Sequence, residues 1–211
     1  MENQEIEPRV VIAIPLASSL IYWQVVAGIL SLEKPAETDL MVFQGALVDR
    51  ARNQLVEQML THPIEPTHIF FMDGDILPAR DTLTRLLVAQ EPIISGVYRK
   101  RTPPHEPMAF RFHGTKKILK PIATTLKKKT EVDVVGAGCL LIERQVFEKI
   151  KGPWFTSEWT QAGHLSEDFS FCQKAKKSGF KIMVDPLVNP LHIEAVGIGG
   201  AGNKVEFVPL T

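Results

Sequence analysis

The sequence predicts an α/β fold in which a mainly parallel sheet is flanked by helices on both faces. The chain has 211 residues, of which 45% are apolar and 23% charged, so it can bury one full hydrophobic core. Residues 9–15 form an almost continuous apolar run, which is typical of a parallel strand covered on both faces. Strand patterns then alternate with helical patterns as far as residue 97. We therefore expect one domain over residues 1–211.

The first half of the chain is expected to alternate regularly between strands and helices. Helical spacing is clearest where Val48, Arg52, Leu55 and Met59 repeat on one face. Asp81 is placed to cap the start of a later helix. The expected strands cover residues 9–15, 40–44, 67–72 and 93–97, and the expected helices begin near residues 19, 48 and 81.

The second half is less regular. Ser166 is expected to start a helix that ends at Gly179, a residue type common just beyond helix ends. The tail, residues 196–211, is rich in glycine, and Gly197–Gly202 is expected to be a mobile loop that orders over a bound ligand. The other expected elements are a hairpin from residues 108–112 and 118–122, strands at 132–135, 139–142 and 181–184, and a helix at 144–150.

Charge and cysteine content exclude several classes of protein. Lys and Arg together number 24, as do Asp and Glu, so the net charge is zero. A protein that binds DNA or RNA usually carries a basic excess, and a neutral chain has little attraction to acidic membranes. Cys139 and Cys172 both lie in apolar runs and are expected to be buried thiols. A reducing, cytoplasmic location is the simplest expectation.

The uncharged stretch from residue 10 to residue 32 is long enough to cross a bilayer. However, Pro15, Ser18, Ser19 and Gln24 interrupt it, and its first part is β-branched. We therefore expect a buried strand followed by a buried helix, and no transmembrane segment.

An acidic motif follows the third expected strand. Asp73 and Asp75 flank Gly74 at the carboxyl end of residues 67–72, the end that faces the ligand crevice in open α/β sheets. Two neighbouring carboxylates repel each other unless a cation lies between them, and hard oxygen ligands favour Mg²⁺ or Mn²⁺. The alternative is an ordinary acidic turn. An EF-hand loop is excluded, because Leu77 stands where an oxygen ligand is required.

Two further positions combine charge with an apolar helix face. Asp168 shares a face with Phe171 and Cys172, so its carboxylate is expected to enter a cleft, where it can accept a proton from a hydroxyl group. Its neighbour Glu167 is expected to play a supporting role. The alternative for this pair is simple stabilisation of a helix start. Arg52, which also lies on an apolar face, is expected either to contact a nucleotide or to form a structural salt bridge.

Several other residues have a structural and a functional interpretation. His192 follows the last expected strand and can be a structural histidine or a ligand. Gly136 and Gly138 can let a ligand approach the backbone, but Leu141 occupies the third glycine position of a dinucleotide fingerprint, which excludes that motif. Trp154 and Trp159 can be core residues or can stack on a sugar.

The order of these features resembles that of GT-A glycosyltransferases of the family 2 type. The resemblance covers about residues 9–195, and the segment Ala51–Asn53 together with the acidic motif also resembles yeast-type mannosyltransferases. It implies a GT-A type fold with one Rossmann-like nucleotide-sugar-binding domain. Residues 9–97 would form its nucleotide-binding half and residues 98–195 its acceptor and catalytic half.

The resemblance also implies an activity: transfer of a sugar from a nucleotide-diphospho-sugar donor to a saccharide or other hydroxyl acceptor, with Mn²⁺ or Mg²⁺. The metal ligands would be Asp73, Asp75 and His192, and Asp168 would be the base, assisted by Glu167. The implied donor contacts are Arg52, Pro15, Asp73 and Asp75, and the implied sugar contacts are Gly138 and Trp159. A metal-dependent nucleotidyltransferase and a non-catalytic nucleotide-sugar or carbohydrate binding module remain as alternatives.

Overall fold

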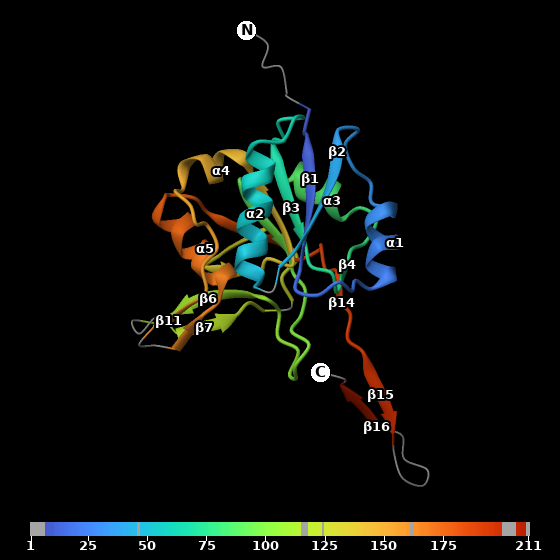
Figure 1. The fold of residues 1–211 in the computed structure, drawn as a ribbon. Coiled ribbons are helices and arrows are strands. Elements are labelled where there is room, and N and C mark those ends of the chain that lie inside the picture. The colour runs from blue at the N-terminus through green and yellow to red at the C-terminus, as the bar shows by residue number, and fades with distance from the viewer. Residues whose placement is uncertain are drawn as a thin grey trace.

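A seven-stranded sheet forms the centre of the computed structural model, which describes residues 7–45, 47–114, 118–123, 125–160, 163–199 and 206–209 (Figure 1). The strand order is β2-β1-β3-β10-β5-β13-β8. Within this sheet, β10 and β8 run against the direction shared by the other strands. The strands are β1 (Val10–Leu16), β2 (Thr38–Gln44), β3 (His68–Met72), β5 (Ile93–Gly96), β8 (Thr130–Val132), β10 (Cys139–Glu143) and β13 (Ile182–Asp185).

Helices cover both faces of the sheet, as the sequence predicted. Side chains alternate along β1, so Val11 and Ala13 enter one core while Ile12 and Ile14 enter the other. The first core is closed by α2, α4 and α5, and the second by α1 and α3 (Figure 1). The helices are α1 (Trp23–Ser31), α2 (Val48–Leu60), α3 (Thr82–Val88), α4 (Arg144–Lys149) and α5 (Glu167–Lys177).

The strand order differs from the order of the strands along the chain. The four strands of the first half do not lie side by side, because β10 inserts between β3 and β5 and runs antiparallel to both. An apolar run that is buried on both faces does not reveal the direction of its strand, so sequence patterning could not show this. The insertion matters for the site, since the backbone N–H of Asp73 donates to the carbonyl of Gly138, directly before β10, at 3.1 Å.

One correction concerns residues 132–135, which were expected to form one strand. Val132 ends β8, whereas β9 (Val134–Val135) pairs with β6 in a separate sheet. Asp133 lies between them, and its carboxylate accepts a hydrogen bond from the backbone N–H of Phe112 and contacts Lys176. These polar contacts anchor the point at which the chain leaves the central sheet.

Smaller antiparallel pairs complete the fold. The predicted hairpin is confirmed as β6 (Ala109–His113) and β7 (Ile118–Pro121). A second hairpin, β11 (Glu158–Thr160) with β12 (Gly163–Leu165), leads into α5, and β4 (Ile76–Leu77) pairs with β14 (Leu191–His192). Helix α5 ends as predicted, because Gly179 adopts a left-handed conformation with φ of 87°.

The tail differs from the irregular loop that its glycines predicted. Gly197 and Gly199 lie in β15 (Val196–Gly199), which pairs with β16 (Glu206–Pro209) and projects from the main body (Figure 1). Gly200 and Gly202 lie outside the described residues. Mobility of this segment stays a prediction.

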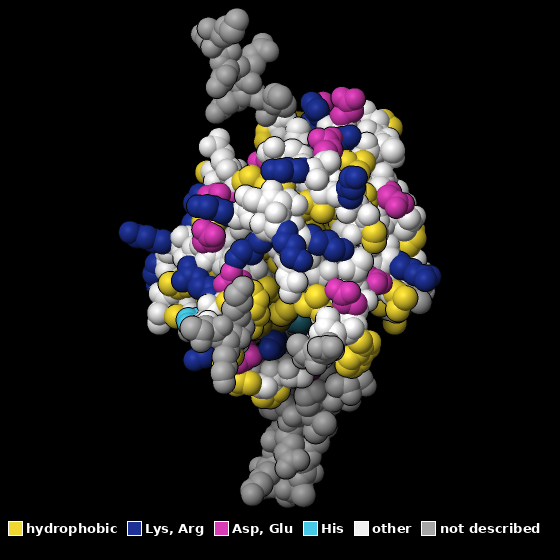
Figure 2. Space-filling model, turned by 90° about the vertical axis from the view of Figure 1, so that its left-hand side faces the viewer, with side chains coloured by type: hydrophobic (Ala, Val, Ile, Leu, Met, Phe, Trp, Pro, Cys, Tyr) yellow, Lys and Arg dark blue, Asp and Glu magenta, His cyan; other side chains and the backbone are white. Residues whose placement is uncertain are grey.

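The uncharged stretch 10–32 forms the expected strand β1 and helix α1, but α1 is buried on one face only, because Trp23 and Leu30 are exposed. Helix α1 begins at Trp23, later than predicted, because residues 17–22 form a loop. Among the residues that the structure describes, no helix is long and apolar enough to cross a membrane. Cys139 and Cys172 are buried free thiols, and burial raises the pKa of each to about 12. Basic and acidic side chains are interspersed on the face that carries α4 and α5 (Figure 2).

Asn53 holds the segment that follows α4 against α2. Its side-chain nitrogen donates to the carbonyls of Asp49 and Phe155, at 2.8 and 2.7 Å. Its side-chain oxygen accepts the backbone N–H groups of Trp154 and Phe155, at 2.9 and 3.1 Å. One side chain therefore makes all these bonds and fixes the loop that contains Trp154 and Phe155 against α2.

We expect Asn53→Ala to lower the free energy of unfolding by about 2–3 kcal/mol, because it leaves backbone groups of the loop without partners. Chemical denaturation measures this change. Gln58→Ala, at an exposed position of the same helix, is the control and is expected to change the free energy by less than about 0.5 kcal/mol. Equal effects of the two substitutions would show that the Asn53 bonds do not hold the loop.

Candidate functional site

A cavity of about 760 Å³ opens at the carboxyl ends of β1 and β3. The acidic motif forms its polar wall, and the loop between β1 and α1 forms its apolar wall. Pro15, predicted to contact a donor, belongs to this apolar wall. The cavity is lined by Pro15, Leu16, Ala17, Ser18, Leu20, Ile21, Tyr22, Val48, Asp73, Gly74, Asp75 and Arg101.

Arg52 connects the acidic motif to helix α5. Its Nη2 lies 2.8 Å from Oδ1 of Asp73, and its Nε lies 3.3 Å from Oε1 of Glu167. A third nitrogen, Nη1, donates to the carbonyl of Ala137 at 3.3 Å. The guanidinium also lies over the ring of Phe71, 5.3 Å from its centroid. Arg52 thus has the arrangement of the structural salt bridge, and its contact with a nucleotide stays a prediction.

The protonation of this cluster follows from burial and pairing. Burial alone would lower the pKa of Arg52, but the carboxylates of Asp73 and Glu167 raise it above its usual value. Arg52 therefore remains a cation. Burial raises the pKa of Asp73, and the attraction of Arg52 only partly offsets this effect. The cluster therefore depends on Arg52 to keep its carboxylates charged.

Asp75 and His192 meet at the edge of the cavity, as the sequence predicted. Oδ2 of Asp75 lies 3.3 Å from Nε2 of His192, and the backbone N–H of Ile193 donates to the carbonyl of Asp75 at 2.8 Å. Burial acts to raise the pKa of Asp75, but the contact with His192 and the charge of Arg101 hold it below its usual value. The pairing of β14 with β4 brings these distant residues together.

The geometry of His192 suits a metal ligand. Nδ1 lies 2.7 Å from the carbonyl oxygen of Arg99, and Nε2 faces the carboxylate of Asp75. Burial acts to lower the pKa of His192, but the contact with Asp75 raises it above its usual value. When Nε2 loses its proton, the Arg99 carbonyl keeps the other proton on Nδ1 and leaves Nε2 free to bind a cation. One carboxylate and one imidazole are too few to enclose an ion by themselves. Mg²⁺, however, typically uses one or two protein ligands together with water and substrate phosphates. The pair therefore fits a divalent cation that binds together with a phosphorylated ligand.

Asp73, the third predicted metal ligand, does not form a group with Asp75 and His192. In the described part of the chain, no three His, Cys, Asp or Glu side chains are grouped to hold a metal ion. Asp73 directs Oδ1 to Arg52, and its Oδ2 lies against Gly138. The expectation of Asp73, Asp75 and His192 as one ligand set is corrected accordingly, because the buried guanidinium draws Asp73 inward.

Glu167 and Asp168 are both buried at the start of α5. Helical spacing predicted that Asp168 would enter the cleft more directly than Glu167, but both are buried, because Arg52 lies across the helix start and pairs with Glu167. Glu167 thus holds Arg52, and its expected supporting role in catalysis stays a prediction. Ser166 uses its hydroxyl to contact Asp168, and the backbone N–H of Phe169 donates to Asp168 Oδ1 at 2.8 Å.

Burial raises the pKa of Asp168 to about 6, and the neighbouring charge of Glu167 adds to this increase. A carboxylate with a pKa close to neutrality is suited to general-base catalysis. The raised pKa is consistent with Asp168 as the proton acceptor, but Asp168 does not line the cavity, so this role stays a prediction.

Gly136 and Gly138 serve the protein rather than a ligand. A Cβ at Gly138 would lie 2.9 Å from Oδ2 of Asp73 and 3.0 Å from the ring of Tyr98, and one at Gly136 would lie 2.2 Å from the Tyr98 hydroxyl. The hydroxyl of Tyr98 accepts the backbone N–H of Gly138 at 3.1 Å. This packing does not support the predicted approach of a ligand to these glycines, or the sugar contact at Gly138.

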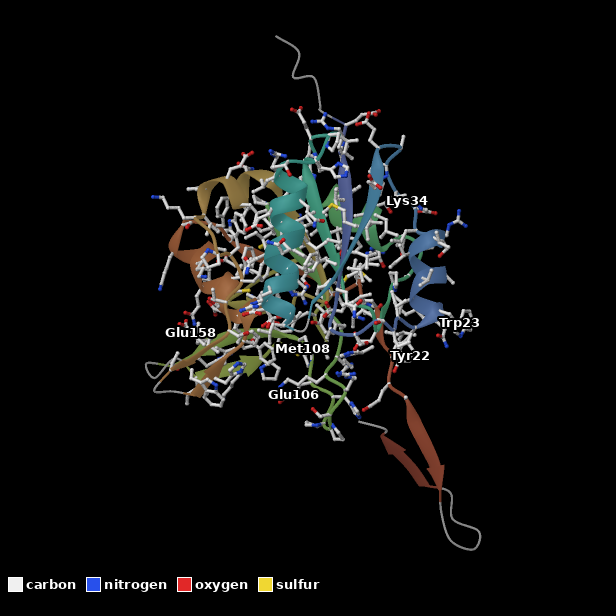
Figure 3. The ribbon with its side chains drawn as sticks, viewed as in Figure 1. Tyr22, Trp23, Lys34, Glu106, Met108 and Glu158 are labelled. Carbon is white, nitrogen blue, oxygen red and sulfur yellow. The ribbon has the colours of Figure 1, made fainter. Side chains whose placement is uncertain are left out.

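The two loop tryptophans have different environments. Trp154 is a core residue, because its indole N–H donates to the carbonyl of Ile150 at 2.7 Å at the end of α4. Trp159 is 83% exposed on β11 and lies beside His164, with ring centroids 5.2 Å apart. Figure 3 shows Glu158, next to Trp159, and Tyr22, at the cavity, on opposite sides of the molecule, with Met108 between them.

Two site residues were missed by the sequence interpretation. Arg101 lines the cavity and lies 3.3 Å from Asp75, but in the sequence it is one of many basic residues in an irregular segment. Tyr98 is buried against Gly138 and His192, and burial raises its pKa well above the usual value. Its position directly after the strand at 93–97 was the available signal.

Solved structures with this fold include A197 from STIV and GalNAc-T7, the latter in a structure with UDP, GalNAc and Mn²⁺. A197 is 18% identical, with a TM-score of 0.66, and the alignment covers 89% of this chain and 86% of A197. GalNAc-T7 is 12% identical, with a TM-score of 0.62, and 90% of this chain matches 44% of that chain. No protein-family model and no curated protein matches the sequence. The similarity establishes a glycosyltransferase-like fold of the GT-A kind.

Proposed function

We propose that the protein is a glycosyltransferase that moves a sugar from a nucleotide-diphospho-sugar to a hydroxyl acceptor. The observation that carries the proposal is the cavity of about 760 Å³ that ends at the paired Asp75 and His192. Its apolar wall suits a nucleoside, and its polar wall suits a diphosphate with a divalent cation. The GT-A-like fold and the nucleotide, sugar and Mn²⁺ named for GalNAc-T7 support the same proposal.

The residues of the site have separate tasks in this proposal. The loop between β1 and α1, with Pro15 and Tyr22, holds the nucleoside, while Asp75 and His192 hold the cation. A bound Mn²⁺ or Mg²⁺ supplies positive charge that stabilises the departing nucleoside diphosphate. Asp168 accepts the proton of the acceptor hydroxyl as that oxygen attacks the anomeric carbon, which is the arrangement of an inverting transfer.

The acceptor is proposed to approach from the side of the β11–β12 hairpin. This hairpin leads directly into the start of α5, and its exposed Trp159 presents an aromatic face beside His164. Aromatic faces of this kind stack on sugar rings, so a saccharide acceptor is favoured. For transfer, the acceptor would extend from this hairpin toward the cavity, along the start of α5, where Arg52 joins Glu167 to Asp73 of the cavity wall.

Replacement of Asp75 tests the metal site. We expect Asp75→Asn to keep the fold and to abolish the Mn²⁺-dependent part of donor binding, because an amide is a much weaker ligand for hard cations. Calorimetric titration of UDP-, GDP- and ADP-sugars, with and without Mn²⁺, measures the effect. Asp81→Asn, on the exposed surface near α3, is the control for the loss of one charge. Unchanged Mn²⁺-dependent binding in Asp75→Asn would contradict the proposed metal site.

Product analysis separates the proposed activity from its alternatives. Incubation with nucleotide sugars and saccharide acceptors is expected to release a nucleoside diphosphate and to form a glycoside. Release of pyrophosphate from a nucleoside triphosphate and a sugar phosphate would indicate a nucleotidyltransferase instead. Donor binding without any turnover would indicate a binding module.

A further inference from the structure

The charges around Asp75 are unusual for a site that is to hold a cation. Its Oδ2 faces two basic side chains at once, Nε2 of His192 at 3.3 Å and Nη1 of Arg101 at 3.3 Å. Among the described residues that line the cavity, Arg101 is the one with a positively charged side chain, and about half of that side chain is exposed. The guanidinium thus lies beside the place where the cation would bind.

We infer that Arg101 has two binding positions: it pairs with Asp75 when no divalent cation is present, and it binds the diphosphate of the nucleotide when the cation occupies Asp75. The inference rests on the proposed function and names a further donor-binding residue of the same site. The ligand of Arg101 in the second position is a phosphate group, because the planar guanidinium can donate two parallel hydrogen bonds to phosphate oxygens.

Arg101 and a divalent cation compete for one oxygen atom of Asp75. A divalent cation coordinates a carboxylate oxygen at about 2.0–2.6 Å, and it repels a guanidinium that contacts the same oxygen. Arg101 must then lose its contact with Oδ2 of Asp75. The bound cation then replaces Arg101 as the counter-charge of Asp75, so the departure of Arg101 does not leave this carboxylate unpaired.

After it leaves Asp75, Arg101 can bind the diphosphate. The cavity wall also carries Asp73 and Asp75, so a diphosphate in the cavity meets carboxylates as well as the cation. Arg101 is already inside the cavity and can neutralise a phosphate oxygen by rotation of its own side chain. The base of its loop is fixed, because Met108 donates to the carbonyl of Tyr98 at 2.8 Å and Lys100 donates to that of Glu106 at 2.9 Å.

The test combines two binding measurements on Arg101→Gln that are expected to change in opposite directions. Without nucleotide, Mn²⁺ binding followed by electron paramagnetic resonance is expected to become about two- to fivefold tighter, because a competing cation is lost. With saturating Mn²⁺, the nucleoside diphosphate that the wild type binds best among UDP, GDP and ADP is expected to bind about ten- to a hundredfold more weakly. Neither readout requires turnover.

Lys100→Gln is the matched control, because it removes one positive charge from the same loop. Lys100 pairs with Glu106 at 2.8 Å and does not line the cavity, so both affinities are expected to stay at wild-type values. Unchanged Mn²⁺ affinity in Arg101→Gln would overturn the pairing step, and unchanged diphosphate affinity would overturn the phosphate step. Failure of the wild type to bind any of the three nucleotides would instead overturn the proposed function, and the inference with it.

Discussion

Arg52→Met is expected to lower the free energy of unfolding by about 3–5 kcal/mol at neutral pH. The side chain of Arg52 is 3% exposed and pairs with both Asp73 and Glu167. Methionine fills much of the same space but leaves Asp73 and Glu167, which are mostly buried, without a counter-charge. Removing one partner of a buried ion pair is among the most destabilising single changes, because the remaining charge keeps its desolvation cost. Denaturation by urea measures the loss.

Arg50→Met is the matched control for this prediction. Arg50 is exposed two residues earlier on the same helix, so its replacement is expected to change the free energy of unfolding by less than about 0.5 kcal/mol. Arg52→Lys keeps the charge but loses the planar fork that reaches Asp73, Glu167 and Ala137 together, so an intermediate loss is expected. A loss below about 1 kcal/mol in Arg52→Met would show that the ion pairs do not stabilise the fold.

The pH dependence of Arg52→Met gives an independent readout. Burial already raises the pKa of Asp73, and removal of Arg52 takes away the attraction that opposes this effect. A carboxylate whose pKa is higher in the folded state than in the unfolded state favours folding at low pH, and this contribution is lost as pH rises through the folded-state pKa. The difference in stability between wild type and Arg52→Met is therefore expected to shrink as pH falls from 7 toward 5.

Asp168→Asn is expected to lower kcat by ~10²–10⁴-fold while the affinity for the donor stays near the wild-type value, because general-base catalysis typically contributes that much to the rate. Asparagine keeps the shape of the side chain, but it cannot accept the acceptor's proton. Asp168 contacts Ser166 and the backbone of Phe169 at the start of α5 and does not line the donor cavity, so its replacement is expected to leave donor binding unchanged. Steady-state kinetics with donor and acceptor varied separately measures the two effects.

The pH profile checks that assignment. Because the pKa of Asp168 is about 6, wild-type kcat is expected to fall as pH decreases through about 6, where the base becomes protonated. Asp168→Asn is expected to lose this acidic limb. Normal turnover by Asp168→Asn, or retention of the anomeric configuration in the product, would contradict the role of Asp168 as base.

Glu167→Gln separates the neighbouring carboxylate from this role. The substitution removes one of the two charges that Arg52 pairs with, so it is expected to act mainly on stability and on the position of Arg52. Its effect on kcat is expected to be much smaller than that of Asp168→Asn. A loss of kcat confined to Glu167→Gln would transfer the base role from Asp168 to Glu167.

Local sequence patterns predicted the elements of this protein well. The apolar run of β1, the helical repeat of α2 and the glycine after α5 each depend on neighbouring residues, so the sequence alone indicated them. The acidic motif after β3 was predictable for the same reason, since strand ends and charged turns are local features. These patterns were sufficient to predict the α/β class and the edge of the sheet that carries Asp73 and Asp75.

Contacts between distant segments were decided only by the tertiary structure. The insertion of β10 beside β3, the pairing of Arg52 with Glu167 and the approach of Arg101 to Asp75 join residues far apart in the chain. Periodicity reports which face of an element is buried, but not which element covers that face or which charge lies across it. For this reason the sequence identified Arg52 as a buried cation and Asp168 as an inward acid. Only the fold showed that Arg52 pairs with Asp73 and Glu167. As a result, Asp75 is left to pair with His192.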